Sequence, residues 1–215
     1  MDVVSEQEWA AAAAEFRERE KAATRERDAL AAARRRLPAV EVDPAHRFVG
    51  PGGRELTLAD LFDGRPQLIV YHHMLGPADD DPCAGCCLFT DNVGHLDHLN
   101  ARGVTFALSS RAPIDEIEAF RARMGWDVPW YSDPGGFRDA MGVRGFQLDV
   151  FLREGERVLR TYSTTGRGVE ALGSTWTFLD LVPFGRQETW EDTPAGRPRS
   201  EPYVWWRRHG EYAAT

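Results

Sequence analysis

Residues 68–89 read LIVYHHMLGPADDDPCAGCCLF, and this stretch decides the fold. It begins with an apolar run at 68–71, which is typical of a strand in a parallel sheet covered on both faces. A loop rich in Gly, Pro and Asp follows at 76–82. From Cys83 onward the apolar residues take helical spacing. We therefore expect a buried strand, a loop over the sheet edge, and a pair of cysteines at the start of a helix.

The chain has three cysteines, and two of them, Cys83 and Cys86, are separated by two residues. Unpaired N–H groups and the helix dipole at a helix N-terminus favour a thiolate on the first sulfur. The two-residue spacer allows the second sulfur to reach the first and form a disulfide. We therefore expect Cys83 to be a nucleophile and Cys86 to resolve the mixed disulfide that Cys83 would form.

The composition limits the classes of function. The chain has 215 residues, of which 42% are hydrophobic, and a net charge of −8. An acidic chain is a poor match for nucleic acid or an anionic membrane, which need a basic face, so we expect neither as a partner. No apolar run approaches the roughly 18 residues of a transmembrane helix, and the first residues, MDVVSEQEW, do not resemble a signal peptide. Three clustered cysteines are too few for a disulfide framework, so we expect a cytoplasmic protein.

The sequence divides into three parts: an N-terminal helical arm at 1–40, a central domain at 41–183 and a C-terminal extension at 184–215. The arm is rich in Ala, Glu and Arg, begins with a capping-box pattern at Ser5 and Glu8, and ends before Pro38. Two interpretations of the arm stay open, a helix laid on the domain or on a second subunit, and a partner-binding or dimer-swapping arm. A homodimer through this helix is thus one expectation.

The central domain has a recognisable order of elements. We expect them in these places: strand 67–74, a helix that starts at the dithiol and has its apolar spacing at 88–99, strand 104–108, helix 114–124, short strand 128–131, helical turn 137–141, strands 146–152 and 158–164, and helix 169–179. Parallel βαβ, a helix, an antiparallel hairpin and a last helix is the thioredoxin order, so the fold class is α/β and thioredoxin-like. In the extension, we expect Tyr203, Trp205 and Trp206 to hold an aromatic tail against the domain.

Several segments resemble a bacterial thioredoxin-like family described as predicted dithiol–disulfide oxidoreductases, within the thioredoxin and peroxiredoxin superfamily. The matching segments are VYHHMLGP at 70–77, CAGC at 83–86, SSRAPIDEIEAFRARMGWDVPWYS at 109–132, VFLREGERVLRTYSTTGRGVE at 150–170 and WWRRHGEY at 205–212. The resemblance implies a redox-active disulfide between Cys83 and Cys86, and a thiol or disulfide substrate, either protein or small molecule. We expect no cofactor, because the chain has no Rossmann glycine fingerprint and no P-loop.

The sequence departs from two patterns of the superfamily. Thioredoxins have a cis-proline opposite the dithiol, which helps to hold substrate backbone and keeps metals off the thiols, whereas residues 144–148 here read RGFQL. Peroxiredoxins have a proline seven residues before the peroxidatic cysteine. Here Gly76 and Asp79 occupy the corresponding positions before Cys83 and Cys86. Peroxidase activity by the usual mechanism is therefore disfavoured.

Cys87 leaves a second hypothesis open. It directly follows Cys86 and projects about 100° further round the helix, so we expect a small core residue. The spacing Cys83-x-x-x-Cys87 is also similar to that of copper-handling relatives of thioredoxin. A zinc or copper site built from Cys83, Cys86 or Cys87 and a nearby histidine is therefore one alternative. A thioredoxin-like interaction module with an inactive dithiol is another.

Histidines and aspartates flank the cysteines. His72 and His73 end the first strand, where ligand sites of parallel sheets gather, but they face opposite sides, so at most one should approach the cysteines. A buried imidazole bonded to a backbone carbonyl is the other interpretation for each. We expect His95 and His98 on the surface of the dithiol helix. The three aspartates at 79–81 would raise the pKa of a neighbouring thiol, unless they form only a solvated loop.

Overall fold

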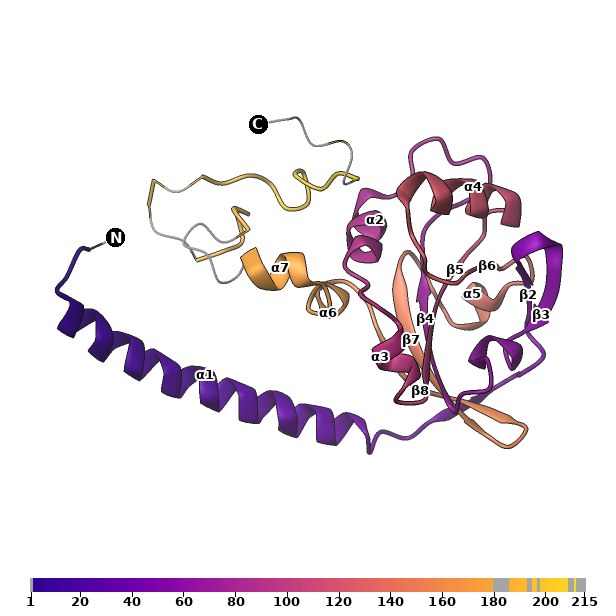
Figure 1. The fold of residues 1–215 in the computed structure, drawn as a ribbon, viewed down its shortest axis with the longest axis horizontal. Helices are drawn as coiled ribbons and strands as arrows, with labels where there is room; N and C mark the ends of the chain where they lie inside the picture. Colours follow the sequence, from indigo (N-terminus) through magenta and orange to yellow (C-terminus); the bar gives the residue numbers. More distant parts are fainter. Residues whose placement is uncertain (1, 180–185, 193–194, 197, 209–210, 212–215) are drawn as a thin grey trace. The chain divides into compact units, whose positions relative to one another are not determined.

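The computed structural model describes residues 2–179, 186–192, 195–196, 198–208 and 211. It contains two compact units, Met1–Pro38 and Ala39–Thr215. Figure 1 shows the first unit as one long helix and the second as a sheet with helices around it.

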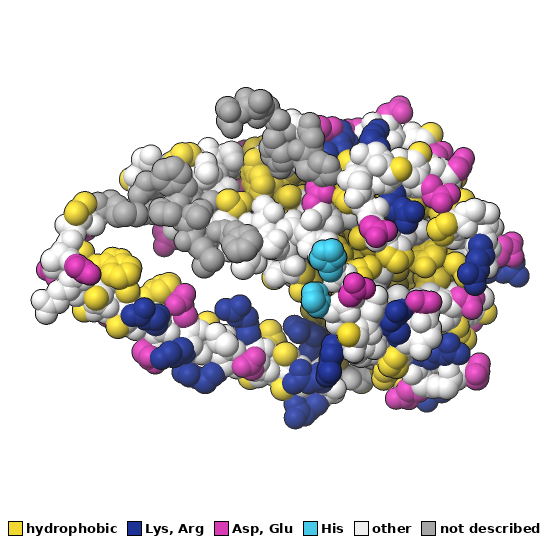
Figure 2. All heavy atoms as spheres, in the orientation of Figure 1, with side chains coloured by type: hydrophobic (Ala, Val, Ile, Leu, Met, Phe, Trp, Pro, Cys, Tyr) yellow, Lys and Arg dark blue, Asp and Glu magenta, His cyan; other side chains and the backbone are white. Residues whose placement is uncertain are grey.

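The first unit is helix α1 (Glu6–Arg34). Its start is a reciprocal capping box, in which the Glu8 N–H donates to Ser5 Oγ (3.3 Å) and the Ser5 N–H donates to Glu8 Oε2 (3.0 Å). Acidic and basic side chains alternate along the helix with hydrophobic ones between them (Figure 2). The expected helix is therefore confirmed, and its role in a dimer stays a prediction. Among the described residues, no helix is both long enough and apolar enough to cross a membrane.

The second unit is built on a mixed sheet whose eight described strands lie in the order β1-β8-β7-β4-β5-β6-β2-β3. Their bounds are β1 (Val40–Val42), β2 (Arg47–Gly50), β3 (Arg54–Thr57), β4 (Gln67–His72), β5 (Val104–Ser110), β6 (Trp130–Ser132), β7 (Gln147–Glu154) and β8 (Arg157–Thr164). Strand β4 pairs in parallel with β5 and antiparallel with β7, and β5 pairs in parallel with β6. Strand β4 is thus held by hydrogen bonds on both edges.

Short helices connect these strands. Their bounds are α2 (Ala84–Asp91), α3 (Asp97–Asn100), α4 (Ile114–Met124), α5 (Phe137–Ala140), α6 (Arg167–Glu170) and α7 (Ser174–Leu179), with 3-10 turns η1 (Pro51–Gly53) and η2 (Asp60–Phe62). The parallel β4–α2–β5 unit, helix α4, the β7–β8 hairpin and the following helices form a thioredoxin-like fold, as the sequence predicts.

Each face of the sheet carries its own hydrophobic core. On β4, Leu68 and Val70 face the core that contains η2 and α5, whereas Tyr71 faces the core that contains α2, α4 and Trp176 of α7. Successive strand residues point to opposite faces, so a strand buried on both sides needs a continuous apolar run. This is why residues 68–71 lack the alternation of a half-exposed strand.

The single helix expected from the dithiol through the apolar positions at 88–99 is wrong. It ends at Asp91, and α3 begins only at Asp97. The side chain of Asn92 explains the break, because its Nδ2 donates to the Leu88 carbonyl (2.7 Å) and its Oδ1 accepts from the backbone N–H of Thr175 (2.9 Å). A side chain that bonds to a distant segment fixes the chain direction at this point, and spacing alone does not reveal it.

The expected helix at 169–179 is also divided, into α6 and α7. The break at Gly173 brings the Trp176 ring onto the backbone, since a Cβ at Gly173 would lie 2.2 Å from that ring. Trp176 is therefore buried, whereas Leu172, which has the same apolar helical spacing in the sequence, is exposed.

The Asn92 contacts generate a stability prediction. Asn92→Ala removes the bonds from α2 to the start of α7, and each lost hydrogen bond of this kind costs about 0.5–1.5 kcal/mol. We expect the free energy of unfolding to fall by about 1–3 kcal/mol in urea denaturation. Asn100→Ala, at a similarly half-buried asparagine in α3, is the control and should stay close to wild type. Equal losses in the two variants would contradict the assignment.

Candidate functional site

Cys83 is the N-cap residue of helix α2. Its sulfur accepts a hydrogen bond from the backbone N–H of Cys86 at 3.5 Å, and the residue is half-buried. The hydrogen bond from the Cys86 thiol, followed by the backbone N–H groups of Cys86 and Gly85, lowers the Cys83 pKa from 9.0 to about 6, although partial burial opposes this. At neutral pH the sulfur is therefore mainly a thiolate.

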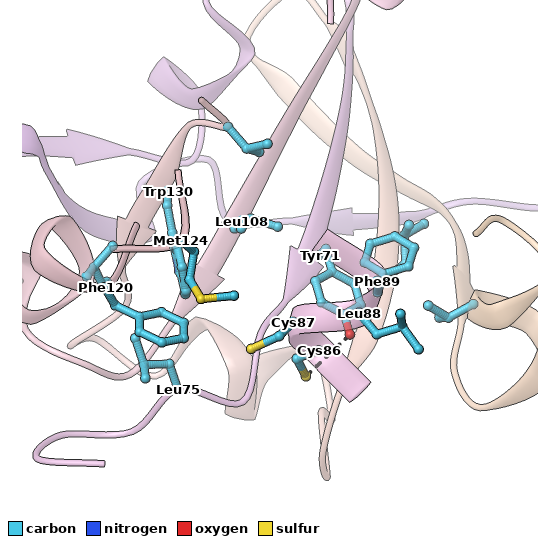
Figure 3. Packing of buried hydrophobic residues seen from close by; sticks show 14 of the residues in the cluster. Tyr71, Leu75, Cys86, Cys87, Leu88, Phe89, Leu108, Phe120, Met124 and Trp130 are labelled. Atoms are coloured by element: carbon cyan, nitrogen blue, oxygen red, sulfur yellow. Dashed lines mark hydrogen bonds between the residues drawn. The ribbon is translucent and has the colours of Figure 1, made fainter. Parts of the chain in front are cut away.

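Cys86 lies one turn inside the helix and is fully buried. The hydroxyl of Tyr71, on β4, donates to Cys86 Sγ at 3.4 Å (Figure 3). Burial raises the pKa of Cys86 well above 9, and the hydrogen bond to the neighbouring Cys83 sulfur acts in the same direction. The pair thus has one accessible sulfur that ionises easily and one buried sulfur that holds its proton, and both are free thiols in this structure.

Cys87 is also fully buried and packs with the core residues around Leu75 and Phe120 (Figure 3). Burial raises its pKa to about 12. The side chain is therefore a neutral core thiol in this structure. In the described parts of the chain, no three His, Cys, Asp or Glu side chains come together as a metal-binding group.

The acidic loop before α2 forms hydrogen bonds within itself. The Asp79 carboxylate accepts hydrogen bonds from the backbone N–H groups of Gly76 (3.4 Å) and Asp81 (3.2 Å). It is also the aspartate whose charge raises the pKa of Cys83, against the larger lowering by hydrogen bonds. Asp81 pairs instead with Arg208 of the tail, at 3.3 Å. The tuning effect expected from three aspartates is therefore centred on Asp79.

The C-terminal tail lies against the dithiol helix. Arg208 donates to the Pro82 carbonyl at 3.0 Å, and the Trp206 ring covers Gly85 so closely that a Cβ there would lie 2.4 Å from it. A small cavity of about 30 Å³ remains between the tail and the helix. Its lining residues are Tyr71, Cys83, Gly85, Phe89, Phe146, Val169, Glu170, Trp176 and Trp206. Cys83 therefore faces a narrow, largely apolar space that the tail helps to close.

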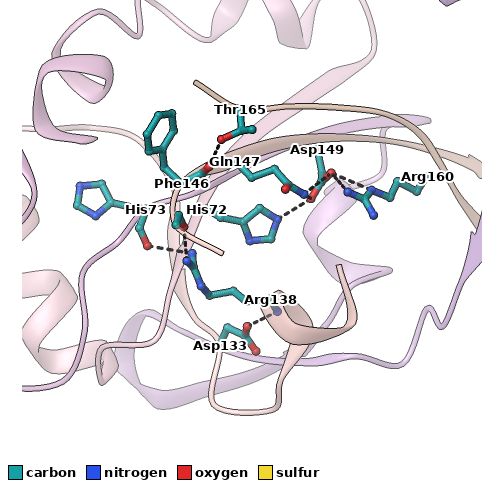
Figure 4. A network of polar contacts seen from close by, with 10 residues as sticks. His72, His73, Asp133, Arg138, Phe146, Gln147, Asp149, Arg160 and Thr165 are labelled. Atoms are coloured by element: carbon teal, nitrogen blue, oxygen red, sulfur yellow. Dashed lines mark hydrogen bonds and ion pairs between the residues drawn. The ribbon is translucent and has the colours of Figure 1, made fainter. Parts of the chain in front are cut away.

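The two histidines after β4 bond elsewhere. His72 Nε2 lies 2.9 Å from Asp149 Oδ2, and Asp149 also forms an ion pair with Arg160 at 2.7 Å (Figure 4). His73 Nδ1 accepts from the backbone N–H of Leu75 at 3.1 Å, and burial lowers the His73 pKa to about 3. The expectation of a backbone carbonyl partner is thus wrong for both, because a carboxylate and an N–H group hold them. Within the described chain, neither imidazole bonds to a cysteine sulfur.

The segment at the thioredoxin cis-proline position has a different anchor. Arg138 Nη1 donates to the His73 carbonyl (3.1 Å) and its Nη2 to the Gly145 carbonyl (2.5 Å), as Figure 4 shows for this network. Phe146 follows and lines the cavity beside Cys83. No cis peptide bond occurs among the described residues. A buried guanidinium and an aromatic ring therefore take the place of the proline.

His95 and His98 lie outside the dithiol helix, contrary to expectation. His95 is in the segment between α2 and α3, and His98 is in α3. Both are exposed, as predicted. Arg111 pairs with Asp139, so its charge is directed away from the aspartates that precede Cys83.

Sequence reasoning missed the roles of Tyr71 and Arg208. Tyr71 has the spacing of an ordinary core residue, and only its hydroxyl in the otherwise apolar run at 68–71 was a signal. Arg208 lies more than a hundred residues from its partner Pro82, so no local pattern could connect them. The expected contact of the aromatic tail with the domain is confirmed by Trp206.

A sequence model of the family described as "Bacterial protein of unknown function (DUF899)" matches residues 1–212. The chain belongs to the DUF899 family. Among curated proteins, none matches the sequence. Solved structures similar to this DUF899 protein include a peroxiredoxin Q variant from Xanthomonas campestris, with 17% identity, a TM-score of 0.49, and coverage of 66% of this chain and 98% of that one. A Chlorobium tepidum protein described as a thiol:disulfide interchange protein, DsbE, has 18% identity and a TM-score of 0.44, covering 63% and 93%.

The ionisation of Cys83 predicts a pH profile for alkylation. A thiol with a lowered pKa reacts as thiolate above that pKa and is protected below it, so the iodoacetamide rate at Cys83 should rise with a midpoint near pH 6. Mass spectrometry of quenched samples assigns the label to each cysteine. Cys86 and Cys87 should stay unlabelled through neutral pH, because burial raises both of their pKa values. A Cys83 midpoint near 9 would contradict the geometry.

The contact between Gly85 and Trp206 predicts a second effect. Gly85→Ala puts a methyl group into the Trp206 ring, so the ring must leave the helix. We expect Cys83 to react severalfold faster with a bulky maleimide, with little change toward small iodoacetamide. Gly94→Ala is the matched control, since a Cβ there has no neighbour within 4 Å. If both variants keep the wild-type ratio of the two rates, Trp206 does not restrict access.

Proposed function

We propose that this DUF899 protein is a thiol–disulfide oxidoreductase that uses Cys83 as nucleophile and Cys86 as resolving thiol. The observation that supports this most is the asymmetry of the pair. The accessible sulfur of Cys83 has its pKa lowered to about 6, and the sulfur of Cys86, one turn deeper, is buried and protonated. A nucleophile must be exposed and ionised, whereas a resolving thiol must wait until the mixed disulfide has formed.

The reaction needs no cofactor. The Cys83 thiolate attacks one sulfur of a substrate disulfide R–S–S–R′, the S–S bond breaks, and R′–S⁻ leaves and takes a proton from water. Cys86 then loses its proton and attacks Cys83 of the mixed disulfide, so that R–S⁻ leaves and a Cys83–Cys86 disulfide remains. The substrate gains two electrons and the protein dithiol loses them. A reducing thiol returns the protein to the dithiol form, and the same steps in reverse oxidise a substrate dithiol.

We assign the reaction to the cytoplasm, where reducing conditions keep such a pair in the dithiol form. The substrate class is a disulfide that can bring one sulfur up to the narrow space beside Cys83. Phe146 and Trp206 border this space, so an apolar group next to the substrate disulfide would be favoured there.

The proposal predicts different defects for the three cysteines. Cys83→Ser should abolish reduction of a disulfide substrate, because the two remaining thiols are fully buried. Cys86→Ser should still attack the substrate disulfide once through Cys83 and should then accumulate the mixed disulfide there, as intact mass spectrometry would show. Cys87→Ala, at the adjacent buried thiol, is the control and should keep most of the activity.

Equal disulfide reductase activity in Cys83→Ser, Cys86→Ser and wild type would overturn this function. A mixed disulfide that accumulates on Cys87 and not on Cys83 would also overturn it, because Cys83 would then not be the residue that attacks the substrate.

A further inference from the structure

Tyr71 carries a polar hydroxyl into the core beneath the dithiol. The residue is 1% exposed, and its ring packs on Phe89 with centroids 4.2 Å apart. In the sheet, its Cα pairs with those of Leu108 on β5 and Leu148 on β7. Because the ring is buried and packed on Phe89, the hydroxyl is held in place and does not rotate toward solvent.

The partner of this hydroxyl is the sulfur of Cys86. Tyr71 donates to Cys86 Sγ at 3.4 Å, and both groups are buried (Figure 3). A neutral phenol stabilises a sulfur anion by donating its O–H hydrogen bond to it. A hydrogen bond to a charged group is stronger than one to a neutral group. This contact therefore favours the ionised form of Cys86 over the thiol.

We propose that Tyr71 is a catalytic residue that donates a hydrogen bond to the Cys86 thiolate while Cys86 attacks the mixed disulfide. This inference rests on the proposed function and adds a residue to its second step. In that step the proton of Cys86 passes to water, the new Cys83–Cys86 bond forms as the bond to the substrate sulfur breaks, and the leaving thiolate takes up a proton. Tyr71 keeps its own proton throughout.

The surroundings of Cys86 explain why such a donor matters. Once Cys83 is joined to substrate, its sulfur is neutral, so Cys86 must ionise in a buried site. Besides Cys83, the titratable groups near Tyr71 and Cys86 among the described residues are His73, Cys87, Arg138 and Glu170. Glu170 lines the same small cavity and pairs with Arg186 at 2.6 Å. His73 and Cys87 are neutral at physiological pH, since burial lowers the pKa of the first and raises that of the second. Arg138 is charged, but its hydrogen bonds go to the carbonyls of His73 and Gly145.

Tyr71 is suited to donating and not to acting as a base. Burial raises its pKa well above 10, and the neighbouring Cys86 acts in the same direction. The phenol therefore stays protonated over the whole range in which the two cysteines exchange.

The test separates the two chemical steps with one equivalent of the aromatic disulfide DTNB added to reduced protein. The first phase of coloured thiolate release reports attack by Cys83, and the second reports displacement by Cys86. Tyr71→Phe keeps the ring and removes only the hydroxyl.

In this variant we expect the first phase to be unchanged and the second phase to be about ten-fold slower, with the pH midpoint of the second phase moved upward. Tyr131→Phe, at a tyrosine packed against the other core, is the control and should match wild type.

A second phase with wild-type rate and pH midpoint in Tyr71→Phe would overturn the role of Tyr71 and leave the proposed function intact. Absence of a second phase in the wild type would overturn both, because Cys86 would then not resolve. If Tyr71→Phe does not fold, protein with fluorotyrosine incorporated at position 71 alone supplies the same test. Its more acidic phenol is a stronger donor, so the second phase should be faster, and an unchanged second phase would overturn the inference.

Discussion

The site depends on the way strand β4 is held in the sheet. Its parallel pairing with β5 and antiparallel pairing with β7 place six residues in register on each side. That register points Tyr71 at the dithiol helix and His72 at the opposite core, where Asp149 binds it. The loop that leaves β4 then delivers Cys83 to the start of α2. A shift of one residue would exchange the two faces, and with them the hydroxyl next to Cys86.

The groups that shift the pKa of Cys83 are its near neighbours, and they act in opposite directions. Hydrogen bonds from the first turn of α2 lower the pKa of Cys83, while Asp79 and partial burial raise it, and the hydrogen bonds prevail. Most of the remaining charge is directed elsewhere. Arg111 pairs with Asp139, Arg208 with Asp81, and the buried Asp149 with Arg160. The reactivity of Cys83 therefore depends on hydrogen bonds from the Cys86 thiol and from the backbone N–H groups of Cys86 and Gly85 more than on a nearby cation.

Much of the fold could be predicted from the sequence, because its signals are local. The apolar run of β4, the position of Cys83 at a helix start and the β7–β8 hairpin follow from short-range patterns. The breaks after Asp91 and at Gly173 could not, since they depend on the contacts of Asn92 and Trp176 with distant or folded-back segments. The same holds at the site. The spacing of Cys83 and Cys86 was visible, but the bond from Tyr71 to Cys86 required the paired strands to be known.

The close contact of Trp206 with Gly85 connects two parts of the chain that are far apart in sequence. Gly85 is the second of the two residues that separate Cys83 from Cys86. Here, the second spacer position has no room for any side chain while Trp206 is in place. The residue at position 85 is therefore constrained by the residue at position 206. In relatives that replace this tryptophan with a small residue, the glycine is released from its constraint, and the two positions should covary.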